Sequence, residues 1–469
     1  MTNDERTVCA TVLPRYLVVG LFLAAMGSGC SDAPSSPTDC ATDAQCTHSE
    51  RCDVATHVCV LSQPADVAPD SLTGSPPFYP FGARFDGPYP YGIKVTGHTS
   101  TEMDAMVEQS YDAWKGARLV QAPVFQPDSG LYAGQTISDG YFVQFGDPTY
   151  GTVSEGIGYG MLITVLMAGY DPMAQTYFDG LFKVARGRPA YAMLATAGAN
   201  IYLNEWQLYP DLSSAGEGYN AADGDLDIAL ALLMADRQWG SIGAINYEAE
   251  ALHTIGAIKA ANFAASGVAY EPQDLSRTSD YMIGHFQSFK SVTGDTFWDD
   301  ARTNSLELVR YMVTNYSATA RLQPGFIDHP LTAVPYPSPG GRIESAQEGM
   351  YDSNAVRNPW RWGVDFLYSN DTAWHDVVND MVTFLKADAD GDPNNTSYAY
   401  SLAGVPQSDR YFAGTLCGPL MVGSMVDPAH QAFLDLLFDK NVSAFSTSYY
   451  VSELQLLPLI IASGNWWRP

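Results

Sequence analysis

Leu226-Asp-Ile-Ala-Leu-Ala-Leu-Leu-Met-Ala235 decides the fold class, because every residue in this stretch except Asp227 is apolar. A helix that is apolar around its whole circumference belongs inside a layered structure and not on its surface. Further helical stretches with mostly apolar residues are expected at residues 163–169, 306–313 and 454–461. Strand-like alternation is sparse elsewhere. We therefore predict an all-α fold in which inner helices are covered by outer ones.

Composition and charge restrict the class of partner. The chain has 469 residues, of which 46% are hydrophobic and 16% charged, so most of it is expected to be globular. Lys and Arg total 24 against 52 Asp and Glu, which gives a formal net charge of -28. This excess of negative charge repels nucleic acid and anionic lipid, and neither is expected as a partner.

The first thirty residues are typical of an export signal. Arg6 and Arg15 precede an apolar run at residues 16–26, which is too short to span a bilayer. The run is followed by Gly27-Ser-Gly-Cys30, which is similar to a bacterial lipoprotein cleavage site with Cys30 as the lipidated residue. We expect an outer-membrane or cell-surface lipoprotein; the alternative is ordinary signal cleavage, which would release an extracellular protein.

Four cysteines lie close together after the signal, at Cys40, Cys46, Cys52 and Cys59. In an exported chain so short a segment cannot bury a core, and we predict a small disulfide-rich module at residues 31–60. The three possible connectivities remain open. Zinc binding with two nearby histidines is the alternative, although a paired C-x-x-C is missing.

Proline-rich composition at residues 61–77 predicts a linker, and residues 78–469 are expected to form the main domain.

Aromatic residues make up 12% of the chain, with 28 Tyr and 9 Trp. Flat aromatic side chains next to carboxylates suit carbohydrate binding, but many of these rings could equally fill a core.

The segment Val153-Ser-Glu-Gly-Ile-Gly-Tyr-Gly-Met161 places an acidic residue before closely spaced glycines, which allow a ligand to approach the backbone. It resembles the S-E-G-x-G-Y-G-M motif of glycoside hydrolase family 8. The resemblance implies an (α/α)6 barrel and assigns Glu155 as the general acid.

A second match is Ala221-Ala-Asp-Gly-Asp-Leu-Asp-Ile-Ala229, which resembles the signature helix of the same family. The resemblance implies that Asp223 holds and distorts the sugar at the cleavage point, with Asp225 and Asp227 completing the hydrogen-bond shell. An acidic cap at a helix N-terminus would explain one of these residues but hardly three.

The catalytic base differs between two branches of the family. One branch has an Asp before an A-x-R triplet, but here the corresponding stretch is Asn354-Ala-Val-Arg357, and an amide cannot act as a base. The other branch has this Asn and supplies a Glu from a preceding loop. On that alignment Glu344 is the base, and Glu348 stands where Asp is usual.

Asp352 is the alternative base, since it lies two residues from Asn354. Glu344 could also be an ordinary solvated loop carboxylate. The preceding residues 335–341 are rich in Pro and Gly, so this loop could be mobile and place Glu344 correctly only with substrate bound.

The resemblance covers residues 78–469 and implies further contacts. Trp206, Trp360 and Tyr159 are candidates for stacking on sugar rings, while Arg357 either orients the carboxylates or braces loops. Further matches are Tyr111-Asp-Ala-Trp-Lys115 and Ser463-Gly-Asn-Trp-Trp467, and looser ones are Ser276-Arg-Thr-Ser-Asp280 and Gln323-Pro-Gly-Phe-Ile327. The eight histidines have no metal spacing, and we expect neither a metal nor an organic cofactor.

The resemblance implies an inverting endo-β-1,4-glycan hydrolase that acts on β-glucan, cellulose or chitosan, with xylan less favoured. We expect the protein to be a monomer. One alternative is a non-catalytic glycan-binding lipoprotein on a degenerate barrel. Another is a helical-barrel epimerase or lyase, which would require His or Tyr as acid and base.

Overall fold

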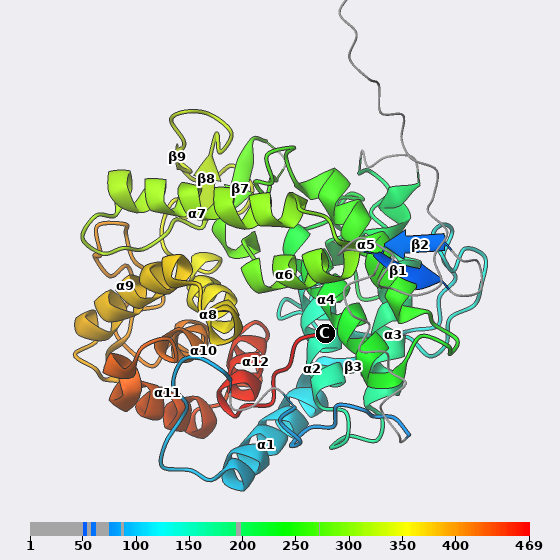
Figure 1. The fold of residues 1–469 in the computed structure, drawn as a ribbon, viewed down its shortest axis with the longest axis horizontal. Helices are drawn as coiled ribbons and strands as arrows, with labels where there is room; N and C mark the ends of the chain where they lie inside the picture. Colours follow the sequence, from blue (N-terminus) through cyan, green and yellow to red (C-terminus); the bar gives the residue numbers. More distant parts are fainter. Residues whose placement is uncertain (1–49, 54–57, 62–74, 86–88, 194–197, 272) are drawn as a thin grey trace, which may run out of the picture. The chain divides into compact units, whose positions relative to one another are not determined.

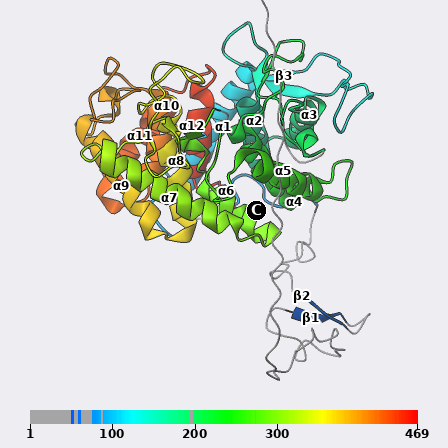
Figure 2. The ribbon, with the colours of Figure 1, turned by 90° about the horizontal axis from the view of Figure 1, so that it is seen from above.

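The computed structural model describes residues 50–53, 58–61, 75–85, 89–193, 198–271 and 273–469. The chain divides into two compact units, Met1–Ala68 and Pro69–Pro469. The larger unit is a double ring of helices in which inner and outer helices alternate along the chain (Figure 1; Figure 2).

Six inner helices form a closed ring, in which each packs against the next and the last returns to the first. They are α2 (Ser154–Leu166), α4 (Ala222–Trp239), α6 (Ile283–Thr293), α8 (Asn358–Ser369), α10 (Gly414–Ser424) and α12 (Val451–Ala462). The outer helices are α1 (Ser100–Arg118), α3 (Ala174–Gly187), α5 (Tyr247–Asn262), α7 (Phe297–Tyr316), α9 (Thr372–Asp388) and α11 (Gln431–Ser443). This arrangement is that of an (α/α)6 barrel, and the prediction of a mostly helical, two-layered fold is confirmed.

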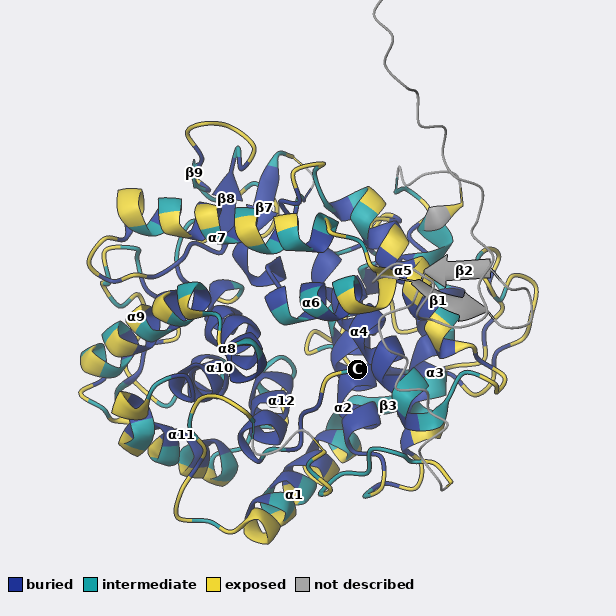
Figure 3. Cartoon of the chain, in the orientation of Figure 1, coloured by how far each residue is buried: buried dark blue, intermediate teal, exposed yellow. Residues whose placement is uncertain are grey.

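Burial follows the layers. All residues of α12 except Val451 are buried, and in α2 every residue except Glu155 is buried. The outer helices expose one side to solvent (Figure 3). The apolar stretch at residues 226–235 lies in α4, where it is buried throughout, as expected for an inner helix.

One local prediction was wrong. The helix was expected to begin at residue 163, but α2 already begins at Ser154, and Gly156, Gly158 and Gly160 lie within its first two turns. A Cβ added at Gly158 would lie 2.9 Å from Cβ of Asp227 and from the carbonyl oxygen of Gly224. Gly158 therefore allows α2 and α4 to pack closely. This packing accounts for a glycine at position 158 without any approach of a ligand to the backbone.

Short strands connect the helices at the end of the barrel where the inner helices begin. The pairs are β3 (Leu119–Gln121) with β4 (Tyr141–Val143), β5 (Thr152–Val153) with β6 (Gln207–Leu208), and β7 (Leu275–Arg277) with β8 (Phe326–Asp328) and β9 (Tyr336–Pro337). β5 leads directly into α2, and β7 ends at Arg277. These strands fix the loops that carry the site.

In the smaller unit the described residues form an antiparallel hairpin of β1 (Glu50–Asp53) and β2 (Val58–Leu61), with Cys52 opposite Cys59. Cys30, Cys40 and Cys46 lie outside the described residues. The export signal, the lipid anchor, the disulfide-rich module and the linker boundaries therefore stay predictions. Cys417 is a buried free thiol. None of the described helices is both long and apolar enough to cross a bilayer.

Candidate active site

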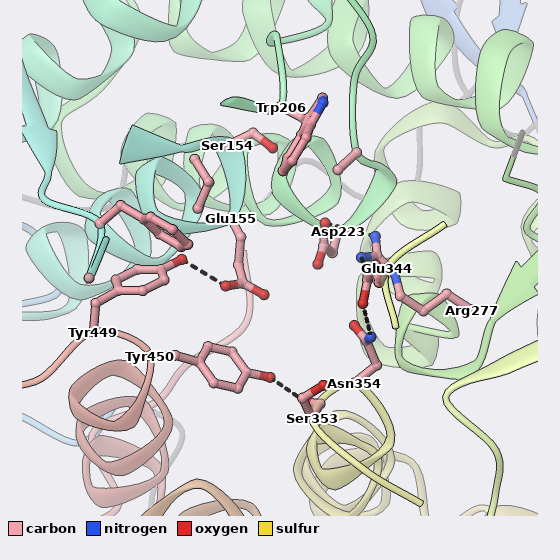
Figure 4. Close-up of a pocket in the computed structure, with 14 residues that line it drawn as sticks. Ser154, Glu155, Trp206, Asp223, Arg277, Glu344, Ser353, Asn354, Tyr449 and Tyr450 are labelled. Carbon is pink, nitrogen blue, oxygen red and sulfur yellow. Dashed lines mark hydrogen bonds and ion pairs between the residues drawn. The ribbon is translucent and has the colours of Figure 1, made fainter. Parts of the chain in front are cut away.

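A pocket of about 380 Å³ opens where the inner helices α2, α4 and α12 begin (Figure 4). Its lining combines carboxylates, one arginine and several aromatic rings. The lining residues are Phe145, Gly146, Val153, Ser154, Glu155, Trp206, Ala221, Asp223, Arg277, Glu344, Ser353, Asn354, Tyr449 and Tyr450. Three of the residues predicted from the sequence as catalytic, Glu155, Asp223 and Glu344, thus face the same space.

Glu155 is in the first turn of α2, where the helix dipole favours a carboxylate. Its Oε2 lies 2.5 Å from Nη1 of Arg357, and its Oε1 accepts a hydrogen bond of 2.7 Å from the hydroxyl of Tyr449. Burial raises the pKa of Glu155 to about 7, with a further contribution from the negative charge of Asp223, against the opposing effect of Arg357. Glu155 can therefore keep its proton near neutral pH, as a general acid must.

Asp223 is in the first turn of α4 and is almost fully buried. Its Oδ2 lies 2.7 Å from Nη1 of Arg357, and its Oδ1 lies 2.9 Å from Nη2 of Arg277. Burial alone would raise the pKa of Asp223, but the two guanidinium groups outweigh it and hold this pKa well below the usual range. Asp223 therefore stays ionised next to a protonated Glu155.

The two arginines link the carboxyl groups into a row in which acidic and basic side chains alternate. Nη1 of Arg357 contacts both Glu155 and Asp223. Arg277 contacts Asp223 and, through Nη1 at 3.6 Å, also Oε1 of Glu344. The order across the pocket is Glu155, Arg357, Asp223, Arg277 and Glu344, which places the predicted acid and the predicted base at opposite ends.

Glu344 lies on the loop between β9 and α8, and its side chain is 41% exposed. Its Oε2 accepts a hydrogen bond of 2.7 Å from Nδ2 of Asn354 (Figure 4). The carboxylate therefore has access to water, and its position in the pocket is fixed by an amide and an arginine.

Buried Glu348 organises the loop that carries Glu344. Its carboxylate accepts hydrogen bonds from the backbone N–H groups of Arg342, Ile343, Glu344 and Ser345, and from the hydroxyl of Ser338. Burial alone would raise the pKa of Glu348, but these donors outweigh it and lower the pKa. An ionised Glu348 thus ties the backbone of this loop to one carboxylate, and the mobility expected from the Pro and Gly content of residues 335–341 stays a prediction.

Asp352, the alternative base, is half-buried and does not line the pocket. Its carboxylate accepts a hydrogen bond from the backbone N–H of Ser353, and burial raises its pKa. A base must reach the attacking water, and Asp352 does not line the pocket whereas Glu344 does, so the geometry favours Glu344 over Asp352.

The residues predicted to bind sugar divide into two groups. Trp206 lines the pocket, as expected. Tyr159 and Trp360 are fully buried beneath it, and Trp360 packs under the guanidinium of Arg361 at 4.0 Å. The prediction that these two rings stack on sugar is corrected, because a sugar in this pocket cannot reach them.

Asp225 is also fully buried and does not line the pocket. It accepts hydrogen bonds from the backbone N–H of Asn204 and from Nδ2 of Asn220, and burial raises its pKa to about 7. Asp225 therefore supports the segment before Trp206 and does not contact substrate directly. Asp227 pairs with Arg361 in the barrel interior.

Sequence reasoning missed Arg277, Tyr449 and Tyr450. Arg277 lay in one of the looser motif matches, and its role depends on contacts with distant carboxylates. The tyrosines lie directly before α12, where the ring of Tyr450 is 5.9 Å from the guanidinium of Arg357. The only signal in the sequence for Tyr449 and Tyr450 is that two adjacent tyrosines precede an apolar helix.

No three His, Cys, Asp or Glu residues form a metal-binding group in the described part of the chain.

Comparisons with known proteins identify relatives over most of the chain. The family model described as glycosyl hydrolases family 8 matches residues 131–321. A beta-glucanase of Niallia circulans is 32% identical over 385 residues, which cover 80% of this chain and 88% of the relative. An endoglucanase of Bacillus sp. (strain KSM-330) is 32% identical over 403 residues, covering 81% and 82%.

Solved structures agree with these sequence relatives. The apo structure of a beta-1,3-1,4-glucanase from Paenibacillus sp. X4 matches with a TM-score of 0.72 and 30% identity, over 81% of this chain and 97% of that chain. A reducing-end-xylose releasing exo-oligoxylanase matches with a TM-score of 0.61 at 18% identity, which shows a shared fold alone.

Proposed function

The chain belongs to glycosyl hydrolases family 8 and is an O-glycosyl hydrolase, and from this premise we propose that it cleaves β-glucan chains internally with inversion at the anomeric carbon. The observation that carries the proposal is the row of alternating acidic and basic side chains across the pocket. It supplies a protonated carboxyl at one end and a water-accessible carboxylate at the other. Inverting hydrolysis needs this pair, with room between them for a water.

Glu155 is the general acid. Its raised pKa keeps a proton available for the glycosidic oxygen as the bond to the leaving sugar breaks. Tyr449 and Arg357 fix the two carboxyl oxygens and therefore the direction in which the proton is delivered. After the transfer, the same two donors stabilise the carboxylate that forms.

Glu344 is the general base. Its exposed carboxylate takes a proton from the water that attacks the anomeric carbon, while Asn354 and Arg277 hold it in place. Asp223 lies between acid and base and stays ionised, so it can accept hydrogen bonds from sugar hydroxyls and stabilise positive charge at the anomeric centre. Trp206 offers a flat surface for a neighbouring sugar ring.

The proposal is tested by reducing-end release and product configuration with the full chain. Mixed-linkage β-glucan, carboxymethyl-cellulose, chitosan and xylan are compared, and the anomer first released is read by NMR. We expect cleavage of β-glucan with an inverted product, loss of activity in Glu155→Gln and Glu344→Gln, and substantial activity in Asp352→Asn. A retained anomer would refute inversion, and activity in Glu344→Gln but not in Asp352→Asn would move the base to Asp352.

A non-catalytic glycan-binding lipoprotein is not favoured, because the pocket keeps the acid, the sugar-binding carboxylate and a base.

We also propose that the chain is exported and carries lipid on Cys30. Cys30→Ala should then move the protein from the membrane fraction to the soluble fraction of the producing cell. An unchanged distribution would support ordinary signal cleavage instead.

A further inference from the structure

Trp206 rests on a tight turn formed by residues 216–219, closed by the hydrogen bond from Tyr219 N–H to Gly216 C=O. A Cβ added at Gly216 would lie 2.4 Å from Cδ1 and 2.6 Å from Nε1 of the Trp206 indole. Only glycine therefore leaves room for this ring against the turn. The backbone N–H of Trp206 in turn donates to the carbonyl oxygen of Tyr219.

A second aromatic ring rests on the same turn. A Cβ added at Gly218 would lie 2.6 Å from Cζ and 2.7–2.8 Å from Cε1 and Cε2 of Tyr191. These three carbons, and not the phenol oxygen, are the nearest atoms, so Gly218 faces the flat side of the ring. Tyr191 is nevertheless 61% exposed, so more than half of its surface is open to solvent.

The turn that carries both rings is itself held by a buried carboxylate. Oε1 of Glu205 accepts hydrogen bonds from the backbone N–H groups of Gly216 and Gly218, at 3.1 and 3.2 Å, and from the hydroxyl of Ser214. Glu205 is 2% exposed and directly precedes Trp206 in the chain. One side chain thus fixes the turn under Trp206 and Tyr191 at once.

From this arrangement we infer a distal sugar-binding platform formed by Tyr191, which extends the catalytic pocket beyond Trp206 and takes a further glucose ring of a long β-glucan chain. The ends of a β-turn lie within about 7 Å, so the two rings are neighbours on one rigid support. A ring that packs against a turn and stays more than half exposed suits the apolar C–H face of a sugar. The inference rests on the proposed function, since it adds a contact for the same polymer.

The platform predicts a dependence on chain length. In an inactive Glu155→Gln background, Tyr191→Ala should weaken binding of mixed-linkage β-glucan by roughly three- to tenfold, the loss of one aromatic contact. Tyr191→Phe should bind like its parent, because stacking needs the ring and not the hydroxyl. In the active enzyme, hydrolysis of the short substrate cellotriose should be unchanged by Tyr191→Ala.

Tyr91→Ala is the matched control. Tyr91 is 41% exposed and its N–H donates to Leu367 near the C-terminal end of α8, at the far end of the barrel from Arg357. Equal polymer binding by the Tyr191→Ala and Tyr91→Ala variants would overturn the inference, and so would an equal loss on polymer and cellotriose. If the wild-type chain cleaves β-glucan in these assays, such a result refutes the platform alone. No cleavage by the wild type would refute the proposed function and the platform with it.

Discussion

Asn354 donates a hydrogen bond of 2.7 Å from Nδ2 to Oε2 of Glu344. The amide of Asn354 cannot act as a base, but it holds in place the carboxylate that we propose as the base. Asn354 also accepts a hydrogen bond from Nη2 of Arg357 on its own Oδ1. Because Arg357 contacts Glu155, the amide connects the base side of the pocket to the acid side.

This relationship predicts different losses for two variants. Glu344→Gln removes the proposed base and should lower kcat by about 10²–10⁴-fold. Asn354→Ala leaves the base in place but frees its side chain, and it should lower kcat by about tenfold with a small change in KM. Steady-state kinetics on β-glucan separate the two, and a loss in Asn354→Ala as large as that in Glu344→Gln would contradict a purely positioning role.

The raised pKa of Glu155 predicts the alkaline limb of the pH profile. Glu155 must be protonated to act, so kcat/KM should fall as pH rises through about 7. The hydrogen bond from Tyr449 lowers this pKa, and Tyr449→Phe should therefore raise it and move the alkaline limb to higher pH. The profile is measured on a neutral β-glucan. A limb that moves to lower pH in Tyr449→Phe would show that Tyr449 does not stabilise the ionised acid.

The sequence predicted Glu155 and Asp223 because each lies in a contiguous motif that carries its own local structure. It did not predict that Arg277 contacts both Asp223 and Glu344, because those contacts join residues that are far apart in the chain. Tyr159 shows the opposite failure. Its motif was found, but burial on an inner helix depends on packing against Trp360 and Arg361, which no local pattern contains.

Glu348 offers a test of loop preorganisation. Glu348→Ala removes the acceptor of four backbone N–H groups, so the loop should lose its fixed conformation and kcat should fall by about 10–100-fold. Gln347→Ala, an exposed neighbour on the same loop, should be close to wild type. Both variants are measured by steady-state kinetics and thermal unfolding. Full activity in Glu348→Ala would mean that the loop reaches its active conformation without this carboxylate.

The contact between α2 and α4 limits the size of residue 158. Gly158→Ala would place a Cβ 2.9 Å from Cβ of Asp227 and from the carbonyl oxygen of Gly224, and both belong to a buried helix that cannot move away freely. Overpacking of this kind typically costs 1–3 kcal/mol, so the free energy of unfolding should fall by about that amount.

Gly256→Ala is the matched control, because Gly256 is an exposed residue within α5 with no atom within 4 Å of the added Cβ. There the substitution should leave stability unchanged or raise it by about 0.5–1 kcal/mol through the better helix propensity of alanine. Denaturant unfolding of the two variants distinguishes these outcomes. Equal stabilities would mean that α2 and α4 can separate without cost and that the glycine is not required for their packing.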